Sequence, residues 1–204
     1  TVMRRLEKEP HLGTYVMGDE ESYGYLIGTE VRDKDAITAT VLTAEMAVHL
    51  VSQGKSVLQR LNEIYEQFGY HEEIQISRYF EGQSGGEIMD SLMRILRNEP
   101  PDAIGGVKVR EIRDYKEQTI KRPGAGVVGR ITLPASNVLQ FVLEDKTVVS
   151  ARPSGTEPKI KFYASVSEAP GPLDQAKKSV AEQLQKIRSW VEATIAAVSD
   201  GGAS

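Results

Sequence analysis

The chain has 204 residues, of which 40% are hydrophobic and 26% charged, and its formal net charge is -4. These values are typical of a globular protein with one large or two small domains, and they argue against a nucleic acid or an anionic membrane as the partner. The absence of cysteine excludes disulfides and thiolate metal sites, and it fits a cytoplasmic location.

The N-terminal residues show no targeting segment. No run approaches the roughly 20 apolar residues of a membrane span, and the start TVMRRLEKEP lacks the apolar core of a signal peptide. Helical spacing of apolar residues is already present from Val2 to Leu6. We therefore expect the chain to begin inside an element and to be a piece of something longer.

Short strands are expected at residues 13–17 and 25–27, on either side of the polar turn GDEESYG. Residues 34–51 carry alanine and apolar side chains on nearly every face, which is typical of a buried helix, with Asp33 as its cap. His49 lies on this apolar helix, so we expect a packed core histidine.

A second helix is expected at residues 56–68, where apolar side chains recur every three or four positions and Gly69 follows. After it the pattern changes from helical to alternating. We therefore place a domain boundary near Tyr70 and expect two domains, residues 1–70 and 71–204.

The second domain is predicted to be an antiparallel sheet covered by two helices, in the order β-α-β-β-β-β-α. Residues 116–130 are expected to form a long polar, glycine-rich loop. The expected strands are residues 73–80, 107–115, 137–144, 147–151 and 160–166, and the expected helices are residues 85–97 and the segment after Pro172.

The segment RPSGTEP, which begins at Arg152, has the composition of an anion-binding turn. Arg152 is a permanently charged, forked donor, Ser154 and Thr156 carry hydroxyls, and Gly155 lets backbone N–H groups approach a ligand. The alternative is a stiff hairpin whose arginine pairs with a neighbouring carboxylate, such as Glu157, since such residues are ordinary turn material.

The turn GDEESYG combines carboxylates with a serine, which suits sugar hydroxyls or a hard metal ion. No calcium-loop pattern follows, and a simple charged turn is the alternative. Lys34 and Asp35 in RDKD also fit the charged first turn of a helix. The histidines are scattered without metal-ligand spacing, so we expect no metal site in this chain.

The glycines at positions 124, 126 and 129 spell G-x-G-x-x-G. The dinucleotide-binding fingerprint requires a strand before it and a helix after it. KRP precedes these glycines and RITLPASN follows them, so we reject that interpretation.

Three segments together resemble one family. RPSGTEPKIKFY resembles the phosphate-binding loop in the last domain of the phosphohexomutases, the phosphoglucomutase and phosphomannomutase superfamily. EESYGYLIGTEVRDKDA is similar to the sugar-recognition loop of the preceding domain, and LPASNVLQFVLED to the strand that leads into the phosphate loop. The segments stand in the family's order, and the resemblance spans essentially the whole chain.

The resemblance implies an α+β fold with an α/β remnant: part of the third domain, followed by a TATA-binding-protein-like sheet with two covering helices. Such enzymes have four domains and interconvert hexose 1-phosphates and hexose 6-phosphates through a bisphosphate intermediate. A phosphoserine in the first domain donates the phosphoryl group, and Mg²⁺ held in the second assists. A glucose 1,6-bisphosphate-type activator is implied as well.

Motif matching assigns roles to residues of this chain. The sugar 3- and 4-hydroxyls would be bound by Glu20 and Ser22, while Lys34 would lie near the substrate and its phosphate. The phosphate that is not reacting would be gripped by Arg152, Ser154, Gly155 and Thr156. These roles would position the substrate, which contributes to catalysis by reducing the entropic cost of reaching the transition state.

The chain also departs from the family pattern, because it has no serine in a T-A-S-H-N-P context and no D-G-D metal loop. We interpret it as the substrate-holding C-terminal third of a phosphohexomutase, most like a bacterial phosphoglucomutase and inactive alone. The expected ligand is a phosphorylated hexose, glucose or mannose. Self-association through the exposed core of the partial domain is expected. The alternative is a non-catalytic anion-binding or interaction module on the same scaffold.

Overall fold

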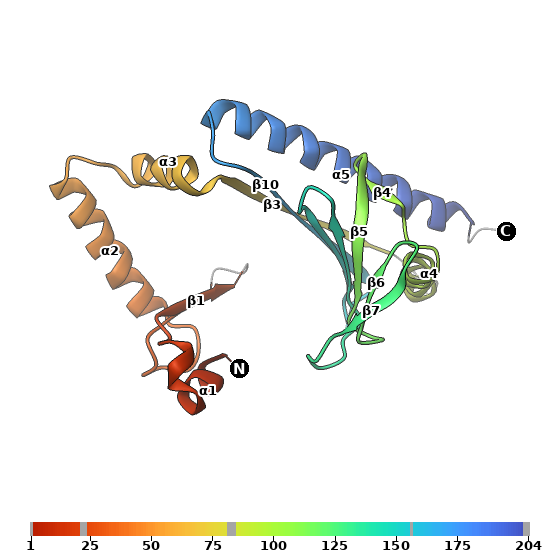
Figure 1. The fold of residues 1–204 in the computed structure, drawn as a ribbon, viewed down its shortest axis with the longest axis horizontal. Coiled ribbons are helices and arrows are strands. Elements are labelled where there is room, and N and C mark those ends of the chain that lie inside the picture. The colour runs from red at the N-terminus through yellow and green to blue at the C-terminus, as the bar shows by residue number, and fades with distance from the viewer. Residues whose placement is uncertain (1, 21–23, 81–84, 156, 202–204) are drawn as a thin grey trace. The chain divides into compact units, whose positions relative to one another are not determined.

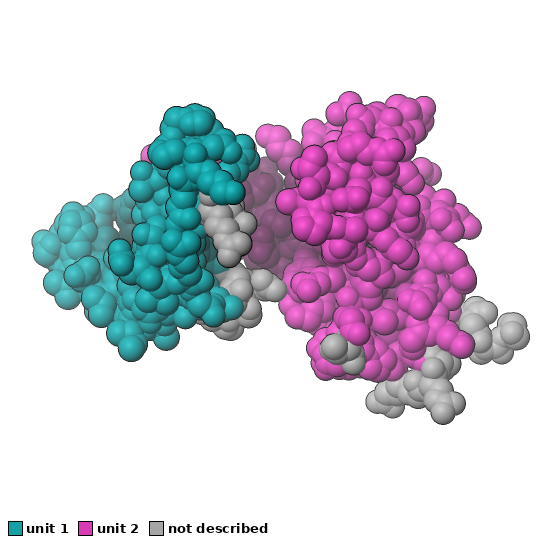
Figure 2. Space-filling view, turned by 90° about the horizontal axis from the view of Figure 1, so that it is seen from below, with its two compact units in different colours: residues 1–63 teal, residues 64–204 magenta. Residues whose placement is uncertain are grey.

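The computed structural model describes residues 2–20, 24–80, 85–155 and 157–201. The chain divides into two compact units, Thr1–Glu63 and Ile64–Ser204, which are coloured separately in Figure 2. The division falls inside a helix, and the boundary expected near Tyr70 stays a prediction. Within the described residues, no helix is long and apolar enough to cross a membrane.

The first unit contains a strand hairpin and several helices (Figure 1). Its elements are α1 (Val2–Lys8), the 3-10 helix η1 (Pro10–Leu12), β1 (Met17–Glu20), β2 (Gly24–Ile27), α2 (Ala36–Ser52) and the first part of α3 (Val57–Phe68). The expected strand at residues 13–17 is wrong except for its last residue. Antiparallel pairing runs from Met17 opposite Ile27 to Glu20 opposite Gly24, and the described residues 13–16 have no place in it.

Helix α2 begins after Asp35, whose carboxylate accepts a hydrogen bond from the N–H of Ile37 at 3.0 Å. The expectation of Asp33 as the cap is therefore wrong. The carboxylate of Asp33 instead accepts from the N–H of Lys34 at 2.8 Å. The hydrogen bond from the Lys34 N–H lowers the pKa of the Asp33 carboxyl. For Asp35, the hydrogen bond from the Thr38 hydroxyl, followed by that from the Ile37 N–H, lowers the pKa of the carboxyl.

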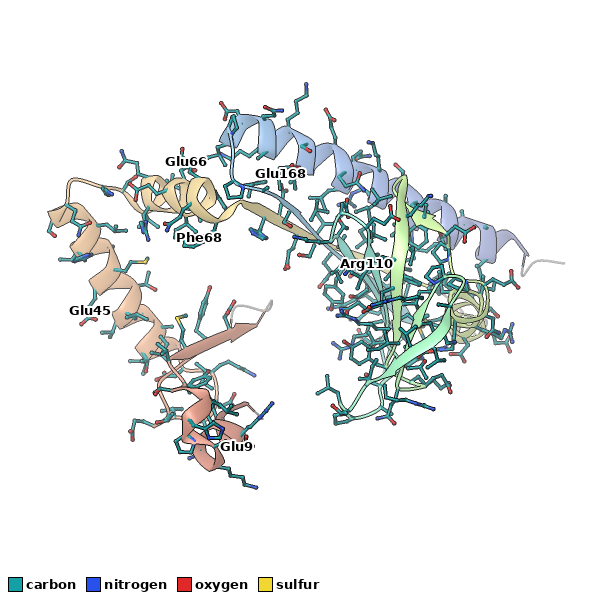
Figure 3. All side chains as sticks on the ribbon, in the orientation of Figure 1. Glu9, Glu45, Glu66, Phe68, Arg110 and Glu168 are labelled. Carbon is teal, nitrogen blue, oxygen red and sulfur yellow. The ribbon has the colours of Figure 1, made fainter. Side chains whose placement is uncertain are left out.

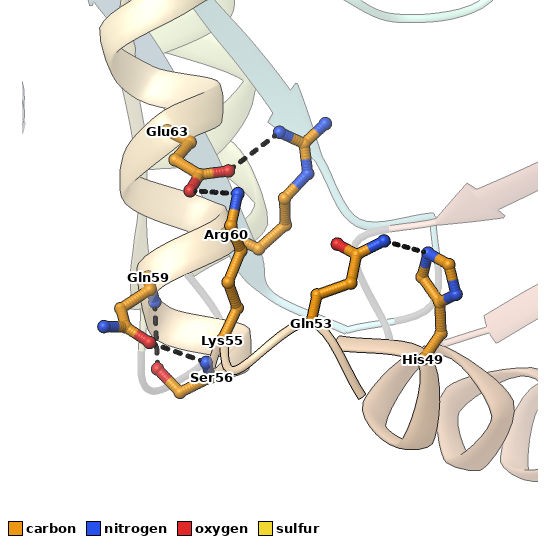
Figure 4. Close-up of polar contacts among 7 residues, drawn as sticks. All are labelled: His49, Gln53, Lys55, Ser56, Gln59, Arg60 and Glu63. Atoms are coloured by element: carbon orange, nitrogen blue, oxygen red, sulfur yellow. Dashed lines mark hydrogen bonds and ion pairs between the residues drawn. The ribbon is translucent and has the colours of Figure 1, made fainter. Parts of the chain in front are cut away.

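The apolar side chains of α2 are exposed, with Leu50 the buried member among the described side chains of this helix. Ile37 is 77% exposed and Val48 is 70% exposed. The expectation of a buried helix is thus wrong for the described residues, because β2 is the element of this unit that packs against α2. His49 is also exposed, so the expectation of a packed core histidine is wrong. Its ring Nε2 forms a hydrogen bond with the side-chain nitrogen of Gln53 at 2.9 Å (Figure 4).

Helix α3 is confirmed, and a capping box starts it (Figure 4). The Ser56 hydroxyl accepts from the N–H of Gln59 at 3.1 Å, and the Gln59 side chain accepts from the N–H of Ser56 at 2.7 Å. Glu63 lies between Lys55 at 2.7 Å and Arg60 at 3.2 Å, which lowers the pKa of its carboxyl. These contacts explain why the helix begins where the sequence predicts.

The second unit is an antiparallel sheet with α4 (Gly85–Asn98) and α5 (Leu173–Gly201) on one face (Figure 1). The strand order is β3-β10-β9-β8-β5-β6-β7, with β4 paired to β5, and all pairs are antiparallel. The α+β class is confirmed. The strands are β3 (Tyr70–Tyr79), β4 (Ala103–Ile104), β5 (Val107–Asp114), β6 (Thr119–Arg122), β7 (Gly126–Arg130), β8 (Leu139–Leu143), β9 (Val148–Pro153) and β10 (Lys159–Glu168).

The expected loop at residues 116–130 is wrong, because most of it forms the hairpin of β6 and β7. Its glycines hide the alternation of a strand, and two of them at the turn, Gly124 and Gly126, take the positive φ angles that a tight turn requires. The hairpin expected around residues 145–146 is confirmed, with Lys146 at φ 73° between β8 and β9.

The core lies between the sheet and the two helices. On β10 the even-numbered positions from Ile160 to Val166 are buried and the odd-numbered positions are partly exposed, as the alternation predicts. The stripe along α5 packs against this face. The buried residues of the two elements are Ile160, Phe162, Ala164, Val166, Ala176, Val180, Leu184, Ile187, Val191 and Ile195.

A buried polar network attaches α4 to the sheet. The Arg97 Nε donates to the Asp114 carboxylate at 2.8 Å, and another of its nitrogens donates to the Asn137 side chain at 3.0 Å. The second carboxylate oxygen of Asp114 accepts from the N–H groups of Lys116 at 3.0 Å and Glu117 at 3.3 Å. One carboxylate therefore holds the end of α4 and shapes the turn after β5.

Candidate functional site

The RPSGTEP turn joins β9 to β10 and is closed by its own hydrogen bonds. The N–H of Ser154 donates to the Lys159 carbonyl at 2.8 Å, and the N–H of Glu157 donates to the Ser154 hydroxyl at 3.3 Å. Thr156 lies outside the described residues. A Cβ at Gly155 would meet nothing within 4 Å, so the protein's own packing does not require glycine there and the space above it is open.

Arg152 is exposed near the end of β9, and the described residues provide no hydrogen bond or ion pair for its side chain. The alternative hairpin interpretation has Arg152 pair with a neighbouring carboxylate, for which Glu157 was the candidate. Glu157 instead forms an ion pair with Lys159. This contact, followed by a hydrogen bond to Tyr79, raises the pKa of Lys159, so its ammonium stays charged. The guanidinium of Arg152 is consequently available to an external anion.

The strand register places Lys161 directly opposite Arg152. Like charges in this position destabilise a sheet unless something lies between them. The Lys161 ammonium is 3.4 Å from the Gln75 side-chain oxygen and 5.9 Å from the centre of the Tyr163 ring, and it has no acidic partner among the described residues. The two cations together suit an oxyanion such as phosphate.

Sequence reasoning placed Lys161 on the polar face of its strand but did not assign it to the site. The alternation along β10 was the available signal, since it puts Lys161 on the face away from the helices. The missing information was the register with β9, which only the folded sheet provides. Lys159 and Lys161 thus flank the turn on the same face of β10 as Arg152 on β9.

A chain of polar contacts continues along this face. Arg113 donates to Glu111 at 2.7 Å and to Gln140 at 3.1 Å, and Gln140 donates to the Ser150 hydroxyl at 3.3 Å. These contacts cross β5, β8 and β9. Glu111 pairs with Arg113 at 2.7 Å and with Arg122 at 3.9 Å, whereas Arg152 and Lys161 have no acidic partner among the described residues.

The predicted sugar-binding residues lie in the first unit. Glu20 is the last residue of β1, opposite Gly24, while Ser22 lies outside the described residues. Lys34 lines a hollow of about 600 Å³ together with Gly24, Tyr25 and the small side chains of α2. Its ammonium is 3.4 Å from Asp33. The structure thus brings Lys34 beside the hairpin that carries the predicted sugar loop.

Another cavity, of about 650 Å³, lies in the second unit at the end of β10 opposite to the turn. Acidic and basic side chains both line it, among them His71 and Lys186. Glu168, which is labelled in Figure 3, lines it as well. Glu168 accepts a hydrogen bond from Ser179 at 3.0 Å. None of the predicted site residues lines this cavity, so its size does not identify the functional site.

Comparisons with known proteins extend the family resemblance. Residues 1–68 match a family model described as phosphoglucomutase/phosphomannomutase, alpha/beta/alpha domain III. Phosphoglucomutase of Staphylococcus aureus strain MRSA252 is 40% identical over 147 residues, which are 72% of this chain and 26% of that protein. Phosphoglucomutase of Staphylococcus haemolyticus strain JCSC1435 is 38% identical over 76% of this chain and 28% of that protein.

A solved structure shares the fold. It is the open form of the exocytosis-sensitive phosphoprotein pp63/parafusin, a phosphoglucomutase from Paramecium. The TM-score is 0.55 at 18% identity, covering 88% of this chain and 30% of that chain, so this likeness concerns the fold alone. The chain spans about a quarter of the length of the curated relatives named here, since the coverage is 26% and 28%.

Proposed function

Because this chain belongs to the phosphohexomutase family as a C-terminal part of such a protein, we propose that it holds a phosphorylated hexose during the interconversion of hexose 1-phosphate and hexose 6-phosphate. The whole enzyme would be an isomerase, with glucose as the hexose and mannose as a further substrate. The observation that carries the proposal is the cationic pair of Arg152 and Lys161 beside a closed turn, without an acidic partner among the described residues.

In this proposal the turn binds the phosphate that is not reacting. Arg152 supplies a planar pair of N–H donors, and Lys161 adds a second positive charge from the opposite strand. Ser154, Gly155 and Thr156 supply hydroxyl and backbone donors. Fixing this phosphate orients the sugar, which removes part of the entropic cost of the reaction.

The sugar itself would be held by the first unit. Glu20 and Ser22 would accept and donate hydrogen bonds with the 3- and 4-hydroxyls, and Lys34 would lie near the substrate and its phosphate. The exposed apolar surface of α2 would be covered by other domains of the protein or by a second copy. A cytoplasmic location is part of the same proposal, as the cysteine-free sequence suggests.

The phosphoryl carrier and the metal belong to other domains in this proposal. In the family, Mg²⁺ and a bisphosphate activator support transfer to and from a phosphoserine. The described residues contain no group of three or more His, Asp and Glu side chains able to hold the ion. The residues of this chain would therefore bind and orient the sugar phosphate.

We expect this 204-residue chain to show no conversion of glucose 1-phosphate to glucose 6-phosphate, even with Mg²⁺ and glucose 1,6-bisphosphate. The reason is that it lacks the serine motif that carries the phosphoryl group. A coupled assay that detects glucose 6-phosphate measures this directly. Turnover that follows the protein through successive purification steps would contradict the expectation.

Arg152→Ala is expected to weaken glucose 6-phosphate binding by roughly 1.5–3 kcal/mol, the range for hydrogen bonds to charged groups. Ser154→Ala and Thr156→Ala should each weaken glucose 6-phosphate binding by about 0.5–1.5 kcal/mol, because a neutral hydroxyl is a weaker donor to an anion than a guanidinium. Arg152→Lys should restore only part of the affinity, since an ammonium lacks the planar fork. The dissociation constant of each of the four variants is measured by titrating it with glucose 6-phosphate at constant ionic strength and following the amide chemical shifts.

The matched control is Arg94→Ala, which removes an exposed arginine from α4 on the other face of the sheet. It should leave the affinity unchanged. If the wild-type amides of the turn do not shift at millimolar ligand, the phosphate site is wrong. If inorganic phosphate binds as tightly as glucose 6-phosphate, the non-catalytic anion-binding module is the better interpretation.

A further inference from the structure

The strand β3 forms one edge of the sheet in the second unit. It pairs with β10 over all ten of its residues, and no other described strand pairs with its outer side. An edge of this length presents a row of unpaired N–H and C=O groups, which are a template for a further strand.

The hydrogen-bonding pattern identifies the outward groups. The N–H of Phe80, just after β3, donates to the Pro158 carbonyl at 2.8 Å. Because the two sides of an antiparallel strand alternate, the even-numbered residues of β3 turn their backbone groups toward β10. The residues whose N–H and C=O groups point outward are His71, Glu73, Gln75, Ser77 and Tyr79.

The even-numbered side chains lie on the helix face of the sheet. Ile74 and Ile76 are half-buried there and pack against the core from the open edge. Glu72 lies toward one end of the strand and accepts a hydrogen bond from Tyr70 at 2.9 Å. Arg78 lies toward the other end, is exposed, and has no ion pair among the described residues. Opposite charges thus flank an apolar centre.

We propose that β3 pairs antiparallel with β3 of a second copy of this chain, with Gln75 opposite the partner's Gln75, to form one continuous sheet. A twofold axis through Gln75 makes the contact self-complementary. Glu72 then lies opposite the partner's Arg78, and Ile74 lies opposite the partner's Ile76. Each of these contacts occurs twice.

This register is selected by charge. A register that keeps the outward backbone groups paired can shift only in steps of two residues. A shift in one direction places Glu72 opposite Ile76, and a shift in the other places it opposite Phe80. Both leave Glu72 and Arg78 without their charged partners. The charges therefore favour one pairing over the others, and charged side chains on edge strands also limit unspecific association.

Two charge reversals test the pairing. Arg78→Glu would place carboxylates opposite each other twice, and Glu72→Arg would do the same with guanidinium groups. We expect each variant to raise the dimer dissociation constant on the order of tenfold or more, since like charges replace opposite charges in both cross-strand pairs. Sedimentation equilibrium over a concentration series measures this constant.

The decisive sample is a mixture of the two variants. A heterodimer of Arg78→Glu with Glu72→Arg has opposite charges in both pairs, so mixing should restore dimerisation to near the wild-type level. The matched control is Arg130→Glu, the same charge change on β7, the other edge strand of the sheet. It should leave the dissociation constant unchanged.

Gln75→Pro tests the backbone independently of charge. The N–H of Gln75 points outward, so proline should spare the pairing with β10 and abolish pairing with a second copy. Circular dichroism shows that each variant is folded. A wild-type chain that stays monomeric at all concentrations would overturn the proposal. Association that both Arg78→Glu and Gln75→Pro leave unchanged would also overturn it and would place the contact elsewhere, for example on α2.

Discussion

Phe162→Ala is expected to lower the free energy of unfolding of the second unit by about 3–5 kcal/mol, the usual cost of removing a buried phenylalanine. Phe162 lies on β10 and is 1% exposed, and its ring meets Trp190 of α5 edge to face at 6.5 Å. The substitution removes this contact and leaves a cavity between the sheet and the helix.

Urea unfolding followed by tryptophan fluorescence measures this loss. The chain has a single tryptophan, which packs against Phe162, so the signal reports on the second unit. Phe68→Ala is the matched control, because Phe68 is 62% exposed on α3 (Figure 3), and it should change stability by no more than about 0.5 kcal/mol. Equal losses of unfolding free energy in Phe162→Ala and Phe68→Ala would contradict the placement of Phe162 in the core.

Asp114→Ala is expected to lower the free energy of unfolding of the second unit by about 3–5 kcal/mol, because removing one partner of a buried ion pair leaves the other charge uncompensated. The side chain of Asp114 is 2% exposed and that of Arg97 is 14% exposed. The substitution also removes the acceptor for the N–H groups of Lys116 and Glu117. The turn after β5 and the end of α4 should loosen together.

The same unfolding measurement applies, with Asp90→Ala as the control on an exposed face of α4. The double variant Asp114→Ala/Arg97→Met should lose less stability than the sum of Asp114→Ala and Arg97→Met, since it leaves no unpaired buried charge. Additive losses would mean that Arg97 and Asp114 contribute independently, contrary to the short contact between them.

Local patterns in the sequence predicted several elements correctly. The alternation of apolar residues identified β10, and the three-and-four spacing identified α3, α4 and α5. These signals depend on residues a few positions apart, because the backbone geometry of a strand or a helix repeats over that distance. The motif RPSGTEPKIKFY also indicated the family before any tertiary contact was known.

Other predictions failed where a distant partner decides the outcome. The apolar composition of α2 predicted burial, but burial requires a second surface, and the described residues of its unit leave most of the helix exposed. The hairpin of β6 and β7 was mistaken for a loop, because its glycines weaken the alternation and its pairing with β5 supplies the stability. The sequence predicted Asp33 as the N-cap of α2, but Asp35 is the N-cap in the structure.

The sequence by itself determined the type and order of most elements, the buried face of β10, and the position of the RPSGTEP turn as a candidate site. Only the tertiary structure decided that Lys161 lies opposite Arg152, that Glu157 pairs with Lys159 instead of Arg152, and that β3 is an open edge. The physical reason is that strand register and edge position depend on pairing between segments far apart in the chain, which local periodicity does not encode.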